Sequence, residues 1–168
     1  MPVTAADIQL HYSGGPNNAN PHLSLGGPIS TYTIASGEMN NLFDNVTEIE
    51  SGTGDTEYRC IYVRNNHPTS SLENAIVWIA QDTPSADDEV DIGVDGSGVN
   101  GEAPQVADES TPPPNVVFSH PTSKSQGLQL GTLGPGQWRA IWLRRTVQPG
   151  AAPYSRNSVV IGVAGATA

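Results

Sequence analysis

Short stretches in which apolar and polar residues alternate recur along the chain and predict β-strands. In residues 8–12 three apolar side chains alternate with two polar ones, as in a strand with one buried face. Residues 29–34 combine Ile, Thr and Tyr, which favour a pleated surface. By the same criteria we expect further strands at residues 57–64, 75–80, 90–94, 116–118, 128–133, 138–143 and 158–163.

Polar turn-forming segments separate these predicted strands. Pro68 lies in one such loop, Thr111–Pro114 forms a spacer, and Gly134–Gly136 forms a turn in which proline presets φ and glycine accepts a positive φ. Consecutive strands joined by polar turns favour antiparallel pairing. The sequence therefore predicts an all-β protein, an antiparallel β-sandwich.

The first part of the chain differs from the rest and predicts an extended N-terminal arm at residues 1–55. No Lys or Arg precedes Arg59, and Gly14–Pro21 is a cluster of turn-formers without apolar residues to bury, apart from one alanine. Segments of this kind gain order by lying against a partner surface, because alone they bury little. We assign residues 56–168 to the sandwich domain.

Within this arm an apolar stripe predicts either a short helix or an irregular loop. Its members lie at helical spacing, but several asparagines between them are poor helix formers and the run is short. The turn-formers at 51–55 end the segment in both interpretations. The stripe consists of Met39, Leu42, Phe43, Val46 and Ile49.

The charge balance excludes some classes of partner. With 17 acidic and 7 basic residues the formal net charge is −10, whereas a nucleic-acid binder needs clustered Lys or Arg, so we expect no nucleic-acid partner. No apolar run approaches the roughly 20 residues that cross a bilayer, and residues 1–4 lack the features of a signal peptide, so we expect no membrane partner. A single cysteine, Cys60, forms no internal disulfide, consistent with a reducing compartment.

Candidate chemistry is sparse, and we expect no catalytic residue, no metal and no cofactor. The four histidines do not share a metal-ligand spacing and are expected at the surface or at interfaces. Cys60 lies in mid-strand between aromatic residues, where a small buried hydrophobe is expected rather than a nucleophile. The histidines are His11, His22, His67 and His120.

Two surface features leave alternatives open. Residues 82–109 carry nine carboxylates without a base, which indicates a solvated acidic face or, less favoured, a calcium site with oxygen ligands. Trp138 and Trp142 lie on one strand face about 13 Å apart, which suits either core packing or a platform for sugars. The latter would make the protein a carbohydrate-binding module.

Two segments resemble parts of immunoglobulin-like domains of the CARDB-like type. Ile61–Asn65 and Asn74–Ile79 are similar to a strand, an Asn-bearing loop and a returning strand in those domains. Leu133–Gln137 is similar to the turn that precedes a late strand. The resemblance implies that the sandwich is immunoglobulin-like.

Over roughly residues 7–145 the chain also resembles small non-enzymatic virion proteins of tailed bacteriophages. The residues that carry this likeness are 25–30, 41–44, 54–60 and the loop at Asn65. The resemblance implies a capsid cement protein, made in the host cytoplasm, that binds the major capsid protein on the outer surface of the virion as a homotrimer. A tail, neck or baseplate component is the alternative.

We expect partner contacts at apolar residues of the arm and at the densest cluster of positive charge. Burying the former at seams between coat subunits would raise the cost of separating those subunits. The guanidinium groups would pair with carboxylates of a neighbouring subunit. The expected contact residues are Ile8, Leu10, Ile29, Leu42, Phe43, Arg139, Arg144 and Arg145.

Overall fold

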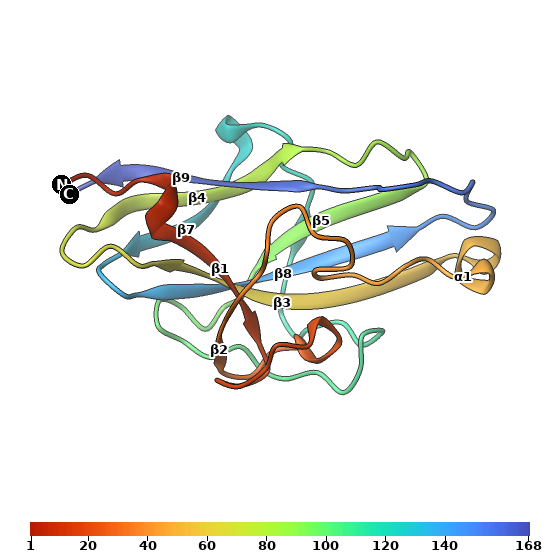
Figure 1. Cartoon of the computed structure of the whole chain (residues 1–168), viewed down its shortest axis with the longest axis horizontal. Coiled ribbons are helices and arrows are strands. Elements are labelled where there is room, and N and C mark those ends of the chain that lie inside the picture. The colour runs from red at the N-terminus through yellow and green to blue at the C-terminus, as the bar shows by residue number, and fades with distance from the viewer.

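A computed structural model, which describes all 168 residues, shows two antiparallel sheets packed as a sandwich (Figure 1). The sandwich predicted from the sequence is thereby confirmed. The six-stranded sheet has the order β2 (Ile29–Thr33), β1 (Ile8–Ser13), β3 (Asp55–Asn65), β8 (Trp138–Val147), β5 (Asp88–Val94) and β6 (Phe118–Ser119). The three-stranded sheet has the order β7 (Leu128–Leu133), β4 (Leu72–Gln81) and β9 (Val160–Thr167).

Three strand pairs of the domain are nested in sequence, whereas the pair of β4 with β9 crosses this order. β3 pairs with β8, β4 with β7 and β5 with β6, and residues 95–117 form the excursion inside the innermost pair. The nested part of this order is wound as in jelly-roll sandwiches, and β9 is an addition to it. It explains why the strands of one sheet come from distant parts of the chain.

The main core lies between the two sheets. On β3 the odd-numbered residues Ile61 and Val63 face it, and Val77 and Ile79 of β4 face it from the other sheet. All four are essentially buried, as the alternation of a strand with one core face requires. This cluster contains 14 buried residues and accounts for the sandwich packing.

A second core covers the opposite face of the six-stranded sheet. Cys60 and Tyr62 of β3, with Trp142 of β8, pack there under the segments around Leu25 and Ala103. The Tyr62 hydroxyl donates to Gly27 O at 2.6 Å and accepts from the Ala103 N–H at 3.0 Å. The long excursion 95–117 and the loop before β2 are therefore parts of the packed domain.

Residues 1–55, expected as an arm, contribute to the sandwich itself. β1 pairs along β3 from Ile8↔Asn65 to Tyr12↔Ile61, and β2 pairs with β1. The side chains of Tyr12, Leu25 and Leu42 are buried. The strands expected at 8–12 and 29–34 are present, but the partner surface that orders them is β3 of the same chain.

The stripe from Met39 to Ile49 does not form a helix, so the loop interpretation holds up to Val46. Instead α1 (Glu48–Thr53) begins two residues after Val46, includes Ile49, and is capped by Thr47. The Thr47 hydroxyl accepts from the Glu50 N–H, and the Glu50 carboxylate accepts from the Thr47 N–H. Gly54, at φ 79°, ends the helix directly before β3.

The two chain ends lie together at one end of the sandwich, and α1 lies at the other (Figure 1). The Val3 N–H donates to Thr167 Oγ1 at 3.2 Å, and Ser71 and Ala168 exchange two backbone hydrogen bonds. Three short 3-10 helices complete the structure, at Ala5–Asp7, Pro21–Leu23 and Lys124–Gln126.

Candidate functional site

An apolar groove opens where the larger sheet extends beyond the smaller one. The three-stranded sheet ends at β9, so it leaves the inner face of β1 only partly covered. The groove has a volume of about 420 Å³. Its apolar walls are formed by Ala5, Ile8, Leu10 and Ile34 on one side and by Ile161 and Val163 of β9 on the other.

The edge of β9 borders this groove. β9 pairs with β4 alone, so its other edge has a row of backbone N–H and C=O groups without a sheet partner. Val160, at the start of the strand, is 46% exposed. Apolar side-chain pockets beside an open strand edge are the elements that bind an extended peptide by strand addition.

The predicted contact residues of the N-terminal segment separate into two groups. Ile8 and Leu10 line the groove and stay partly exposed. Ile29 packs against the second core, Leu42 is buried in the main core, and the Phe43 ring contacts the guanidinium groups of two arginines. The last three therefore stabilise this chain itself.

The three arginines expected to pair with a neighbouring subunit are engaged within the chain. Arg145 pairs with Glu57 and Asp44, because the antiparallel register places Glu57 opposite Arg145. Arg144 lies opposite Asp91 on β5 and binds its carboxylate at 2.7 Å. Arg139 donates to two backbone carbonyls, those of Leu130 and Asp95. The acidic partners of Arg144 and Arg145 come from this chain.

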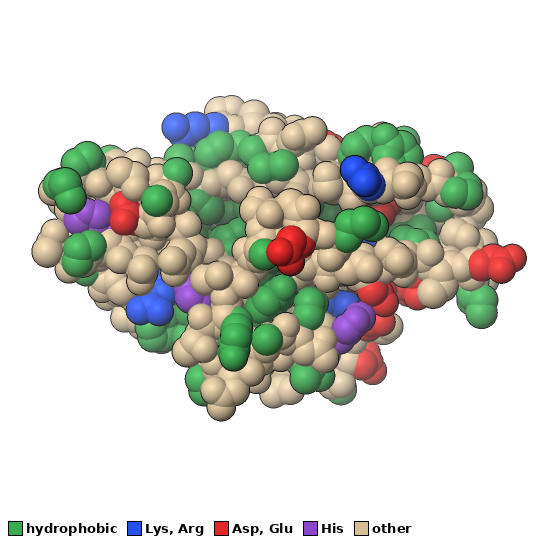
Figure 2. Space-filling view, in the orientation of Figure 1, with side chains coloured by type: hydrophobic (Ala, Val, Ile, Leu, Met, Phe, Trp, Pro, Cys, Tyr) green, Lys and Arg blue, Asp and Glu red, His purple; other side chains and the backbone are tan.

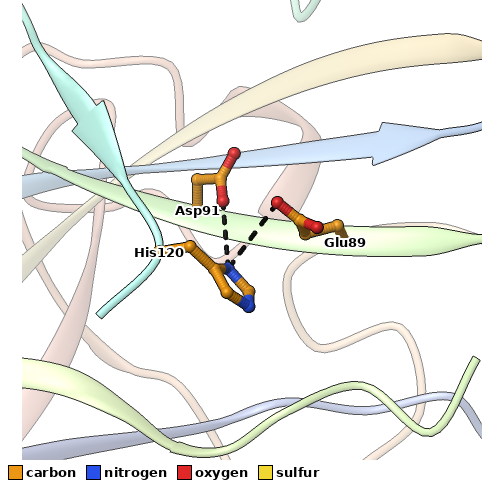
Figure 3. Close-up of side chains that lie close together, drawn as sticks. All are labelled: Glu89, Asp91 and His120. Atoms are coloured by element: carbon orange, nitrogen blue, oxygen red, sulfur yellow. Dashed lines mark hydrogen bonds and ion pairs between the residues drawn. The ribbon is translucent and has the colours of Figure 1, made fainter. Parts of the chain in front are cut away.

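A histidine held by three carboxylates forms the most concentrated group of charges near β5. Figure 3 shows Glu89 and Asp91 of β5 directed toward the ring of His120, which follows β6. His120 Nδ1 lies 3.0 Å from Asp91 Oδ1, 3.0 Å from Val90 O and 3.8 Å from Glu89 Oε1. His120 Nε2 lies 2.9 Å from Asp82 Oδ2.

This geometry makes His120 a charged clasp. Both ring nitrogens face oxygen acceptors, which the doubly protonated imidazolium satisfies with two N–H donors. Burial disfavours the charged ring, but the hydrogen bond and charge of Asp82, together with the charge of Glu89, outweigh it and raise the pKa of His120. The clasp joins the loop after β4, strand β5 and the segment after β6. A metal ion would have to displace these protons.

Residues 82–109 thus form less of a solvated acidic face than the sequence predicts. Asp91 and Asp95 are buried, and Asp95 accepts from Trp142 Nε1 at 2.9 Å. Glu109 pairs with Arg59 at 2.8 Å. The two buried carboxylates have cationic or hydrogen-bonding partners, which burial demands.

The burial of Trp142 and Cys60 decides what these two residues do. Trp142 is fully buried, so it presents no ring face to a sugar, and the paired platform with Trp138 does not exist. Cys60 is fully buried, as expected for a small hydrophobe, and burial raises the pKa of its thiol. Both residues serve the second core.

None of the helices has the length and apolar character that a membrane span requires. In comparisons with known proteins, no protein-family model, curated protein or solved structure matched the chain.

Proposed function

We propose that the protein is a non-enzymatic structural component of a virus particle, a cement protein that binds the outer capsid shell. In this proposal the apolar groove between β1 and β9 receives an extended segment of the major capsid protein. The bound segment would pair with the open edge of β9 and bury apolar side chains against Ile8, Leu10 and Ile161. Many copies on one shell would make the reinforcement collective.

The observation that carries the proposal is the groove. It combines partly exposed apolar side chains with an unpaired strand edge, two features that together suit an extended peptide. Two of its residues, Ile8 and Leu10, are among those that the sequence analysis assigns to partner contact. A peptide that fills the groove would remove apolar surface from water, which favours binding by about 25 cal/mol per Å².

Two further features support the structural role. The chain resembles small virion proteins of tailed phages over most of its length. Three of its strand pairs are nested as in jelly rolls, a sandwich class that includes viral capsid and lectin domains. The second point is an analogy between folds, and folds host many functions.

The test is a binding assay on assembled capsid shells that lack the protein. The double substitution Leu10→Ser with Ile161→Ser removes apolar contacts from both walls of the groove. Because each buried side chain of this size contributes about 1.5–3 kcal/mol, we expect the affinity for shells to fall at least tenfold. Val117→Ser, at an 85% exposed site outside the groove, is the matched control and should bind as the wild type does.

A second measurement covers the case in which the double variant is unstable. A photo-crosslinking amino acid at Ser36, in the wall of the groove, should capture the major capsid protein, and the same amino acid at Val117 should not. Equal binding of the groove variant and the control, or no capture from Ser36, would overturn the docking site.

The copy number in purified virions separates the shell from the tail. Quantitative gel densitometry should find many copies per particle, in proportion to the major capsid protein. A low copy number, in proportion to tail proteins, would place the protein in a tail, neck or baseplate and refute the cement role.

A further inference from the structure

Five carboxylates surround the junction between α1 and β3. Glu57 belongs to two groups of acidic residues whose carboxylate oxygens lie within 4.8 Å of one another. One group contains Glu50 and Asp55, and the other contains Asp44 and Glu109. Figure 2 shows that acidic side chains gather toward the α1 end of the molecule on the visible face.

The local sequence positions these side chains. Asp55 and Glu57 are two residues apart on β3, so they lie on the same face of the strand. Glu50 lies in α1, one turn before Gly54 turns the chain into β3. The Glu50 carboxylate is already held in place by the Thr47 N–H at 2.9 Å.

Positive charge within the chain does not balance this group. Arg145 pairs with Glu57 and Asp44, and Arg59 pairs with Glu109. Two guanidinium groups thus face five carboxylates, and Glu50 and Asp55 have no cationic partner. A cation added on the side of Glu50 and Asp55 would meet negative charge that nothing else compensates.

One buried oxygen of this acidic group, Glu57 Oε1, lacks a hydrogen-bond partner. Glu57 is 1% exposed, its Oε2 accepts from Arg145, and its Oε1 is buried without any hydrogen bond. A buried carboxylate oxygen without a donor is costly, and a bound ion is one of the ways in which proteins satisfy it.

We infer that Glu50, Asp55 and Glu57 bind a hard divalent cation, calcium, between α1 and β3. All three ligands are carboxylates, which calcium prefers and which softer transition metals do not select. Calcium accepts irregular arrangements of six to eight oxygens, whereas Mg²⁺ demands near-ideal octahedral geometry. The site lies outside residues 82–109, where the sequence suggested calcium.

The His120 cluster is the weaker candidate for a cation. Its ring nitrogens and the carboxylates of Asp82 and Asp91 already bond one another. No buried oxygen of the His120 cluster lacks a partner, in contrast to Glu57 Oε1.

The experiment is calorimetric titration of the full chain with CaCl₂ after treatment with a chelator, at neutral pH and physiological ionic strength. We expect one calcium ion per chain and a rise of several degrees in the melting temperature at saturation. Asp55→Asn and Glu57→Gln should each weaken calcium binding at least tenfold. MgCl₂ should bind more weakly than CaCl₂.

Controls separate a specific site from general attraction to an acidic protein. Asp82→Asn and Glu89→Gln remove charge from the His120 cluster and should leave calcium binding unchanged. If Glu57→Gln does not fold, Asp55→Asn, at a half-buried position, carries the test. No heat and no thermal shift with the wild type, or equal losses in the Asp82 and Asp55 variants, would overturn the site. Neither result depends on capsid binding.

Discussion

At the scale of single residues, the register of β8 between β3 and β5 determines which charges meet. It places Glu57 opposite Arg145 on one side and Asp91 opposite Arg144 on the other. The guanidinium carbons of Arg59 and Arg145 lie 5.3 Å and 5.0 Å from the centre of the Phe43 ring. This stacking fixes residues 41–44 on the end of the sandwich. The charged residues can be read from the sequence, but the register of β8 with β3 and β5, which brings them together, cannot.

The His120 clasp predicts a specific dependence of stability on pH. Because the pKa of His120 is raised in the folded state above its ordinary value of about 6.5, the clasp stabilises fully below that value. Its contribution is lost as the pH rises through the higher folded pKa. We expect a loss of up to about 1 kcal/mol in the free energy of unfolding, the upper end for a partly exposed ion pair.

The measurement is urea denaturation from mildly acidic to alkaline pH, for the wild type and for His120→Gln. Subtracting the stability of the variant from that of the wild type at each pH cancels the contributions of other titrating groups, because both proteins contain them. The difference in stability should be largest at acidic pH and should shrink as the pH rises. If the difference in the free energy of unfolding between the two proteins grows with pH, the ring is not held in its charged form by Asp82, Glu89 and Asp91. Arg144, which binds Asp91, is the one positive charge beside this group.

At the scale of elements, alternation of apolar and polar residues located the strands well but not their ends. β3, β4 and β8 extend beyond the predicted ranges, because pairing with neighbours continues after the apolar pattern stops. β6 has two residues, and α1 was missed although Thr47 and Glu50 form a capping box in the sequence. The apolar stripe at 39–49 was misleading, because Leu42 and Phe43 serve tertiary contacts rather than a helix face.

The contact between the loop before β2 and the excursion 95–117 depends on a glycine. A Cβ at Gly26 would lie 2.0 Å from Pro104 O, and its φ of 98° strains any other residue. Gly26→Ala should therefore lower the free energy of unfolding by about 3 kcal/mol or more, from steric overlap added to left-handed backbone strain. Chemical denaturation measures this loss.

Gly15→Ala is the matched control for Gly26→Ala. Gly15 has a similar φ of 106°, but nothing lies within 4 Å of an added Cβ. Gly15→Ala should therefore lower the free energy of unfolding by only about 1–2 kcal/mol, because it adds backbone strain without steric overlap. Equal losses at the two positions would mean that the loop and the excursion do not pack closely.

At the scale of the whole molecule, the sandwich and its antiparallel pairing were predictable, whereas the role of residues 1–55 was not. Composition separated these residues from the rest, yet β1 completes one side of β3. Long-range pairing of this kind leaves no local trace in a single sequence. The groove itself was not predicted: Ile8 and Leu10 were named only as expected contact residues, and Ile34, Ile161 and Val163 come from segments that only the fold brings together.

Deleting residues 1–55 should unfold the protein. The deletion removes β1 and β2 from the larger sheet and uncovers Ile61 and Val63 of the main core. It also removes Leu25 from the second core and the Phe43 ring that two arginines contact. Circular dichroism and limited proteolysis of residues 56–168 should show loss of cooperative melting and rapid digestion. A stable, protease-resistant fragment would restore the view that residues 1–55 form an independent arm.

The hydrogen bonds that hold Val3 to Thr167 and Ser71 to Ala168 keep the two ends of the chain adjacent. A short flexible linker would therefore close the polypeptide into a ring without disturbing either sheet. Such a circularised chain could be reopened at a solvent-facing turn, for example at Gly96, where nothing crowds the backbone. Labels or cargo fused to the new ends at Gly96 would then be attached at a different side of the sandwich.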